Sequence, residues 1–447
     1  MKVLYVSDNR ARGNYGCRAT STALSQLIRQ EHEIVGVISG RYTNHNTNNL
    51  FFCKYFPSWF YKVVGKWKNN SKHRLMIEQL LFGVIRRISK MLSKHYYAGP
   101  CDFVSLNFER SIKNLKKCLP ANPYLEEFNL DNYEFDAMVV NGEGSFIFAT
   151  PEWNWREALV LSMLMYWALK KGKKVYFLNA MFSDESTSPR NHKMLDIINK
   201  LLNKCEVVQV RESVSYQYAI DNLPDSNPVV YPDALFTWYP VINDKHSVTN
   251  GKYYMPHIVE NDLLYESLDF TSPYLCIAGS SSVKTKLNPS QTIESYSKMV
   301  TCLKEKFHGQ IFLIEVCEGD AFLNDVSRQT NTPLISIETP ILAAAKILAN
   351  ARAFISGRYH PAIMASIGGT PCVFMGSNSH KTSSLQDSVL QYPNTHEFCE
   401  VPTDEDINQM IDLTLSYIEQ GEKLRNTIKT RAFHLCQEAQ KIKTLIK

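Results

Sequence analysis

The sequence predicts an α/β protein with two Rossmann-like domains that face a cleft. Three observations lead to this fold class. Short apolar runs alternate along the chain with segments whose apolar residues repeat at helical spacing. An irregular aromatic and polar stretch over residues 237–272 separates two such series. The length of 447 residues also exceeds what one simple hydrophobic core accommodates. We therefore expect an N-terminal domain over 1–240, a linker over 241–272 and a C-terminal domain over 273–447.

The individual elements follow from the apolar pattern. The N-terminal series begins with a strand over 2–8, and a glycine-containing loop leads from it into a helix over 17–30. Its other strands and helices are expected at 33–39, 135–141, 153–171, 174–181, 191–204, 206–210 and 215–222. The C-terminal series is expected at 274–278, 289–307, 310–316, 320–328, 334–337, 341–349 and 353–356, with further helices over 403–446.

A basic and aromatic segment over about 50–133 interrupts the N-terminal series, and we expect it to be an inserted helical segment. Between Lys54 and Lys94 the sequence has seven lysines and three arginines against one acid, Glu78. A basic helix with aromatic flanks can lie on an anionic membrane surface, which would suit an enzyme with a lipid-linked acceptor. Alternatively, an inserted hairpin covers the core and keeps a solvated basic face. Nucleic-acid binding is not expected, because no recognition motif is present.

The composition is that of a water-soluble globular protein. The net charge is +5, and the hydrophobic and charged fractions are 44% and 21%. The eleven cysteines are scattered without ligand spacing, which argues against structural zinc and against a disulfide framework. Residues 1–8 show no signal-peptide h-region or cleavage site, so we expect no signal peptide, and the longest apolar span, 159–169, is too short to cross a bilayer. We expect a cytoplasmic protein, with peripheral contact to the inner face of the membrane as an option.

Two polar residues follow the apolar run over 353–356 and are the main catalytic candidates. Gly357 permits a turn, and Pro361 suits the first position of the helix that follows. Arg358 and His360 are therefore expected in the loop at the end of a strand, where open α/β sheets bind ligands. Arginine matches phosphate or carboxylate, and histidine exchanges protons near neutral pH. The alternative is a surface arginine beside a packing histidine.

Glycine-containing loops follow two strands of the N-terminal series and are candidate binding sites. The first loop can bind an anion or a sugar at the start of a helix, although it lacks the dinucleotide and P-loop patterns. The second places an acid between two glycines, where it can accept hydrogen bonds from sugar hydroxyls or act as a base. A simple turn and a loop carboxylate are the respective alternatives. The candidate residues are Gly13, Asn14, Gly16, Gly142, Glu143, Gly144 and Ser145.

These motifs resemble the signatures of the polysaccharide pyruvyltransferase family. The C-terminal signature is matched by Ser356-Gly357-Arg358-Tyr359-His360, Gly369-Thr370-Pro371 and Lys381, with Tyr359 in place of the usual leucine and Pro361 in place of the usual alanine. The N-terminal block is matched by Gly13-Asn14-Tyr15-Gly16, with Cys17 replacing an acid, and the glycine-rich second motif by Gly142-Glu143-Gly144. Arg211 stands where the family has an essential arginine, and Asp233 lies in its Asp-Pro/Ala-x-Phe block. The resemblance covers roughly 1–45 and 135–385.

The resemblance implies a GT-B fold and transfer of the pyruvyl group of phosphoenolpyruvate to two hydroxyls of a sugar, forming a cyclic ketal and releasing phosphate. His360, Arg358 and Arg211 would be catalytic, Lys381 would bind phosphate or acceptor, and Asp233 would orient Arg211 or contact a ligand. Structural alternatives are an ion pair of Arg211 with Glu212 or the next helix, and a capping role for Asp233. No cofactor and no metal are expected.

Two other functions stay open at this stage. One is a GT-B glycosyltransferase that uses a nucleotide-activated sugar, for example a CMP-ulosonic acid, in the synthesis of a surface polysaccharide. Such a donor also places a carboxylate beside a phosphate, so the same arginines would serve. The other is a non-catalytic glycan-binding protein at a membrane assembly.

Overall fold

The computed structural model describes residues 1–39, 103–120, 123–149, 152–184, 188–244, 264–281, 288–392 and 395–447. Most of the predicted basic insertion and of the predicted linker lies outside the described residues. Of the insertion, the described part contains helix α5 (Phe108–Cys118) and two short 3₁₀ helices, Pro123–Phe128 and Leu130–Asn132. No helix in the described ranges is long and apolar enough to cross a membrane.

The chain forms two compact units that interleave in the sequence. Unit 1 comprises Met1–Asp8, His32–Gln209 and Tyr218–Val229. Unit 2 comprises Asn9–Glu31, Val210–Gln217 and Val230–Lys447. The helix that follows the first strand therefore belongs to unit 2, although that strand belongs to unit 1.

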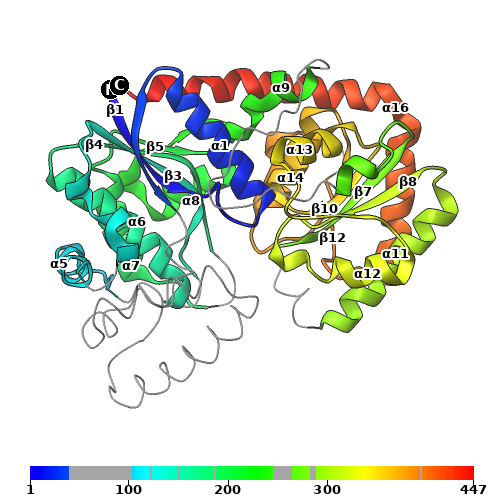
Figure 1. The fold of residues 1–447 in the computed structure, drawn as a ribbon, viewed down its shortest axis with the longest axis horizontal. Coiled ribbons are helices and arrows are strands. Elements are labelled where there is room, and N and C mark those ends of the chain that lie inside the picture. Colours follow the sequence, from blue (N-terminus) through cyan, green and yellow to red (C-terminus); the bar gives the residue numbers. More distant parts are fainter. Residues whose placement is uncertain are drawn as a thin grey trace, which may run out of the picture. The chain divides into compact units, whose positions relative to one another are not determined.

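Unit 1 contains a parallel sheet of six strands in the order β2-β1-β3-β4-β5-β6 (Figure 1). Strand β1 pairs on both sides, so that Val3 lies opposite Ile34 on one neighbour and Ala137 on the other. The strands are β1 (Lys2–Asp8), β2 (Glu33–Ser39), β3 (Ala137–Ile147), β4 (Lys174–Ser183), β5 (Val207–Val210) and β6 (Val229–Val230). The helices are α6 (Glu152–Lys170) and α7 (His192–Leu202), together with α5, whereas α8 (Ser213–Asn222) begins in unit 2 and ends in unit 1.

Unit 2 contains a second parallel sheet, in the order β12-β11-β10-β7-β8-β9. Helices α13 and α14 lie on one face of this sheet, and α11 and α12 lie on the other (Figure 1). The strands are β7 (Tyr274–Ser280), β8 (Gln310–Ile314), β9 (Leu334–Ile335), β10 (Phe354–Gly357), β11 (Cys372–Met375) and β12 (Glu397–Phe398). The helices are α1 (Tyr15–Arg29), α9 (Tyr239–Asn243), α11 (Pro289–Lys306), α12 (Leu323–Thr330), α13 (Ile341–Asn350), α14 (Tyr359–Ile367), α15 (Lys381–Ser384) and α16 (Asp404–Ala439).

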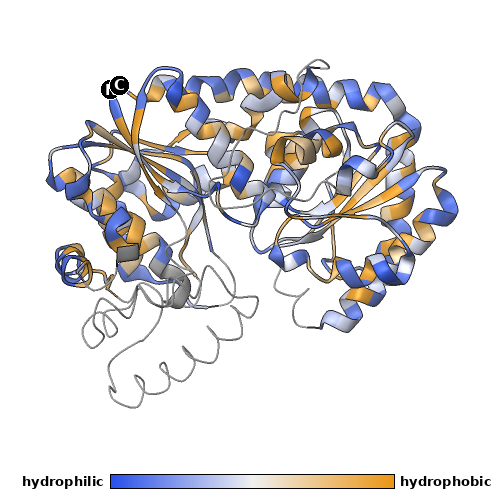
Figure 2. Ribbon diagram, in the orientation of Figure 1, coloured by the Kyte–Doolittle hydropathy of each residue, from blue (hydrophilic) through white to orange (hydrophobic). Residues whose placement is uncertain are grey.

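The central strands are buried along almost their whole length, which explains why they appear in the sequence as continuous apolar runs. Figure 2 shows apolar strands inside each unit, while polar residues occupy the outer faces of the helices. The two parallel sheets with their helices confirm the predicted α/β class.

The second sheet has a topological switch point between β7 and β10. The chain continues from β7 to β8 on one side and from β10 to β11 on the other, so the loops that follow these adjacent strands diverge. Such a point is where open α/β sheets bind ligands. A Cβ atom on Gly357 would lie 2.6 Å from both the carbonyl oxygen of Gly376 and Oγ of Ser280, so only glycine fits there. This close packing places Arg358 at the switch point.

Two predicted boundaries are wrong near the site residues. Helix α14 begins at Tyr359, so His360 lies in its first turn and not in a loop. A proline at the third helical position is tolerated there, because the first amides of a helix have no intrahelical partner. Strand β3 continues through Gly142 to Ile147, since it resumes pairing with β4 after a register shift, whereas the prediction ended it at residue 141.

Candidate active site

Asp233 is the centre of a buried polar network in unit 2. It caps the short 3₁₀ helix Ala234–Trp238 and is 0% exposed. Its Oδ1 accepts hydrogen bonds from the Leu235 amide at 2.9 Å and from Thr20 Oγ1 at 2.7 Å. Its Oδ2 lies 3.1 Å from both Arg211 Nη1 and His360 Nε2. Because protein donors engage both oxygens, Asp233 is placed to orient Arg211 and His360.

The charge of Asp233 is stabilised by these partners. Burial by itself would raise the pKa of the carboxyl group, but the charge and hydrogen bond of His360 and the charge of Arg211 hold that pKa below its ordinary value. His360 Nε2 lies 3.1 Å from Asp233 Oδ2, which only accepts, and 3.1 Å from Arg211 Nη1, which only donates, so both contacts engage Nε2 whichever tautomer is present. The Nδ1 atom of His360 is then the nitrogen left for chemistry.

Arg211 follows directly after strand β5, and its guanidinium is fixed from several sides. Its side chain is 2% exposed, and it is paired with Asp233 rather than with Glu212. The guanidinium carbon lies 4.3 Å from the centre of the Tyr359 ring. The same ring meets His360 edge-on, with centroids 5.1 Å apart and an interplanar angle of 83°. Tyr359 therefore supports both polar groups. A leucine, the usual residue at this position of the family motif, could not form the cation–π contact with Arg211.

His360 is also packed against the first turn of helix α1. Asn14 caps this helix, and its side chain accepts a hydrogen bond from the Cys17 amide at 3.2 Å. A Cβ atom on Gly16 would lie 2.5 Å from His360 Nδ1 and 3.0 Å from its Cβ and Cγ atoms. Gly16 is therefore required by the close approach of the imidazole. Gly13 has more room, because the nearest atom to its Cβ would be Ile337 Cδ1 at 3.3 Å.

Arg358 and Lys381 complete a group of cations in the same unit. Arg358 forms an ion pair with the fully buried Asp320, which keeps the pKa of the guanidinium above its ordinary value against the effect of burial. Lys381 Nζ donates to Asn378 Oδ1 at 2.6 Å. Burial lowers the pKa of Lys381 to about 7, and the charges of Arg358 and Arg211 contribute to the same shift. Arg211 and Arg358 thus both lie within electrostatic reach of Lys381.

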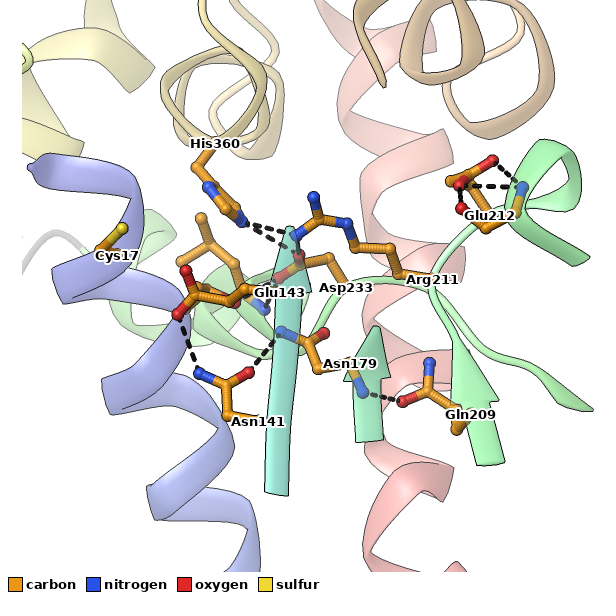
Figure 3. A network of polar contacts seen from close by, with 12 residues as sticks. Cys17, Asn141, Glu143, Asn179, Gln209, Arg211, Glu212, Asp233 and His360 are labelled. Atoms are coloured by element: carbon orange, nitrogen blue, oxygen red, sulfur yellow. Dashed lines mark hydrogen bonds and ion pairs between the residues drawn. The ribbon is translucent and has the colours of Figure 1, made fainter. Parts of the chain in front are cut away.

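The remaining candidates lie in unit 1, on strand β3. Glu143 adopts a left-handed backbone with φ of 37°, and its Oε1 accepts a hydrogen bond from Asn141 Nδ2 at 2.8 Å. Asn179 on β4 is also left-handed, with φ of 56°, and its amide donates to Gln209 Oε1 at 2.6 Å. These side chains belong to the neighbouring strands β3, β4 and β5, and Figure 3 shows them close to one another. Left-handed backbone at residues other than glycine is uncommon and is often found at functional sites.

The two glycines beside Glu143 differ in their surroundings. A Cβ atom on Gly142 would meet Ala180 Cβ at 2.6 Å and Phe177 Cζ at 2.7 Å, so this glycine is required for packing between strands. At Gly144 the nearest atom would be Met181 Cε at 3.6 Å, which leaves room for a ligand or a side chain. Ser145 Oγ lies 3.4 Å from Glu157 Oε1.

Sequence reasoning missed three polar partners of the site. Asp320 pairs with Arg358, Thr20 donates to Asp233, and His380 pairs with Glu212 at 3.1 Å. Asp320 is 38 residues from Arg358, and His380 is 168 residues from Glu212. No local pattern joins residues that far apart, so only the fold reveals these pairs.

Comparison with solved structures supports the fold. The chain is similar to UDP-GlcNAc 2-epimerase from Neisseria meningitidis bound to UDP-GlcNAc, with 12% identity, a TM-score of 0.52, and 99% of this chain and 98% of that chain covered. Os79 from O. sativa in complex with UDP has 10% identity, a TM-score of 0.48 and coverage of 98% and 96%. The Methanocaldococcus jannaschii UDP-GlcNAc 2-epimerase has 11% identity, a TM-score of 0.47 and coverage of 93% of each chain. The similarity to the Neisseria meningitidis enzyme shows a shared GT-B-like α/β fold and no more than the fold.

Sequence comparison identifies the family. No match was found among curated proteins. The family model described as polysaccharide pyruvyl transferase matches residues 14–379, which include the first turn of α1, Arg211, Asp233 and the Arg358–His360 motif. The chain therefore belongs to the polysaccharide pyruvyl transferase family.

Proposed function

We propose that the protein transfers the pyruvyl group of phosphoenolpyruvate to a saccharide as a cyclic ketal and releases phosphate. The observation that carries this proposal is that Arg211 Nη1 lies 3.1 Å from His360 Nε2, while the charges of Arg211 and Arg358 both act on Lys381. Phosphoenolpyruvate places a phosphate and a carboxylate on neighbouring atoms. Guanidinium groups match both anions with paired hydrogen bonds, and an ammonium group adds a point charge.

The arginines and the lysine have different tasks in donor binding. Arg211 and Arg358 are each paired with a buried carboxylate, which fixes their geometry and balances their charge. The additional positive charge for a donor then comes from Lys381. With a pKa of about 7 in the free protein, Lys381 takes up a proton when an anion arrives beside it. Preorganised arginines and a chargeable lysine together suit a small ligand with several negative charges.

The reaction needs one proton delivered and two removed. The methylene carbon of the donor accepts a proton, and one acceptor hydroxyl attacks the neighbouring carbon as its own proton leaves. The bond from that carbon to the phosphate oxygen then breaks, and phosphate departs with the electron pair. The second hydroxyl attacks the same carbon and loses its proton, which closes the ketal. One hydroxyl proton replaces the one given to the methyl group, and the other leaves on phosphate.

His360 is the group we assign to this proton transfer. Asp233 holds its Nε2 atom, and Nδ1 has no hydrogen-bond partner within the described part of the chain. An imidazole with one nitrogen fixed by a buried carboxylate can deliver a proton from the other and take it back. Arg211 beside the ring stabilises negative charge that develops on the donor.

We place the saccharide at the residues of strand β3. Glu143 supplies a carboxylate for sugar hydroxyls, and Gly144 leaves room for close approach of a ring. The acceptor is a sugar of a surface polysaccharide or of its precursor, which includes lipid-linked forms. Gly13 and Asn14 lie at the start of α1, where helix amides favour an anion.

The proposal is tested with phosphoenolpyruvate and a panel of saccharides that carry neighbouring hydroxyl pairs. Phosphate release is followed together with the NMR methyl singlet of the ketal product. His360→Gln should lower turnover at least 100-fold with an unchanged melting temperature, whereas Arg29→Ala, at the exposed end of α1, should match the wild type. Turnover with CMP- or UDP-sugars in place of phosphoenolpyruvate would favour a glycosyltransferase. Undiminished activity of His360→Gln would remove this residue from the mechanism.

A further inference from the structure

We infer that Glu212 is a positioning residue that fixes Lys381 beside Arg211 by bonding both ends of helix α15. This inference rests on the proposed function, since it assigns how the donor-binding lysine is held. All the residues concerned lie in unit 2. The Glu212 side chain does not point toward Asp233 and His360. Figure 3 shows Arg211 directed toward these two residues, while the Glu212 side chain points in a different direction.

The Glu212 carboxylate is buried, charged and bonded by protein donors only. The residue is 1% exposed. The Ser215 amide donates to both oxygens, at 3.0 and 2.9 Å, and the Ser215 hydroxyl donates to Oε1. Burial would raise the pKa of Glu212, but the hydrogen bond and charge of His380, with the Ser215 bonds, lower it to about 2. The carboxylate is therefore a permanent anion anchored at the start of helix α8.

The same carboxylate bonds the two residues that bracket α15. His380, which immediately precedes the helix, places Nε2 at 3.1 Å from Oε1. Ser384, the last residue of the helix, donates its hydroxyl to Oε2 at 2.9 Å. Lys381 is the first residue between these two bonds. Helix α15 continues directly into the π-helical turn Leu385–Val389, so the two bonds hold the first turn of a short helical segment. A segment this short has little stability of its own, so its position depends on such tertiary bonds.

This arrangement links the two cations through neighbouring residues. Arg211 precedes Glu212 in the chain, and Lys381 follows His380. The Glu212–His380 contact therefore sets the separation of Arg211 and Lys381, whose charges already affect each other. Buried polar contacts of this kind are most useful where they fix geometry, since a buried pair adds little net stability. Loss of the contact should let α15 move and weaken the contribution of Lys381 to donor binding.

The test is a double-mutant cycle between Glu212 and Lys381, read out as the dissociation constant of phosphoenolpyruvate by calorimetry. Glu212→Gln should weaken binding about tenfold in the wild-type background, because it removes the charge that holds His380. In the Lys381→Met background the same change should weaken binding less than twofold, because Glu212 acts through Lys381. A purely structural effect would be the same in both backgrounds and would overturn the inference.

Two further variants make the result decisive. Ser384→Ala removes one bond and leaves the Glu212–His380 contact, so it serves if Glu212→Gln does not fold. We expect Ser384→Ala to weaken binding about threefold, and this effect should be absent in the Lys381→Met background. Thr403→Ala disrupts the capping box of α16 in the same unit and should lower stability without changing the dissociation constant. Equal losses in both backgrounds for Ser384→Ala would also contradict the inference. Absence of binding to the wild type would instead refute the proposed donor.

Discussion

Replacing Gly16 with alanine should disable the active site while the fold is retained. The added Cβ atom would lie 2.5 Å from His360 Nδ1 and 3.0 Å from two further atoms of the same side chain. An ordinary contact begins at 3.4 Å, so the imidazole must move by about 0.9 Å. It cannot simply rotate away, because Nε2 is held by Asp233. A misplacement of about 1 Å can cost roughly 100-fold in rate, which corresponds to about 2.7 kcal/mol of transition-state stabilisation.

The assay is phosphate release under saturating phosphoenolpyruvate, compared with thermal unfolding. Alanine is the better helix former by up to about 1 kcal/mol, so the melting temperature of Gly16→Ala should stay within a few degrees of the wild type. Arg29→Ala changes the exposed far end of the same helix and serves as the matched control. A Gly16→Ala protein with wild-type turnover would refute the claim that His360 must occupy this position.

Three further predictions follow from the same contacts. Asp233→Asn leaves the buried Arg211 without its counter-charge, so urea unfolding should show a loss of about 3–5 kcal/mol; a loss under about 1 kcal/mol would contradict this. Lys381 has a pKa of about 7 and is mostly neutral at pH 8, so donor binding there should take up a proton and weaken as pH rises from 7 to 9. Calorimetry in two buffers of different ionisation enthalpy measures this proton uptake, and Lys381→Met should abolish it. If the binding enthalpy of the wild type were the same in both buffers, the predicted proton uptake would be disproved. Thr403→Ala removes a capping box and should cost about 1 kcal/mol in thermal unfolding with full activity, whereas an unchanged stability would count against the cap.

Much of the fold could be predicted because local physics dominates it. Buried parallel strands require continuous apolar runs, and each run that borders the site corresponds to an observed strand: 2–8, 206–210, 274–278 and 353–356. The predicted end of strand β3 was wrong because glycine occurs both in loops and at close contacts within a sheet. Glycines at 142 and 144 are typical of a loop, but Gly142 makes room for Ala180 and Phe177 within a continuing strand.

The candidate site was less accessible to sequence reasoning. Arg358 and His360 share one short motif, and Arg211 stands at a recognisable junction of strand and helix, so their residue types and positions could be recognised. The residues that hold them could not. Asp233 is 127 residues from His360, and Asp320 is 38 residues from Arg358. The orientation of a site depends on such distant partners, which leave no periodicity or spacing along the chain.

Calorimetric titration of the wild-type protein with phosphoenolpyruvate tests the central claim most directly, with CMP-, UDP- and GDP-sugars titrated in parallel. The claim is that Arg211, Arg358 and Lys381 form a binding site for a small donor with neighbouring phosphate and carboxylate groups. We predict saturable binding of phosphoenolpyruvate that inorganic phosphate competes with, and no binding of the nucleotide sugars. Saturable binding of a nucleotide sugar, with none of phosphoenolpyruvate, would contradict the account.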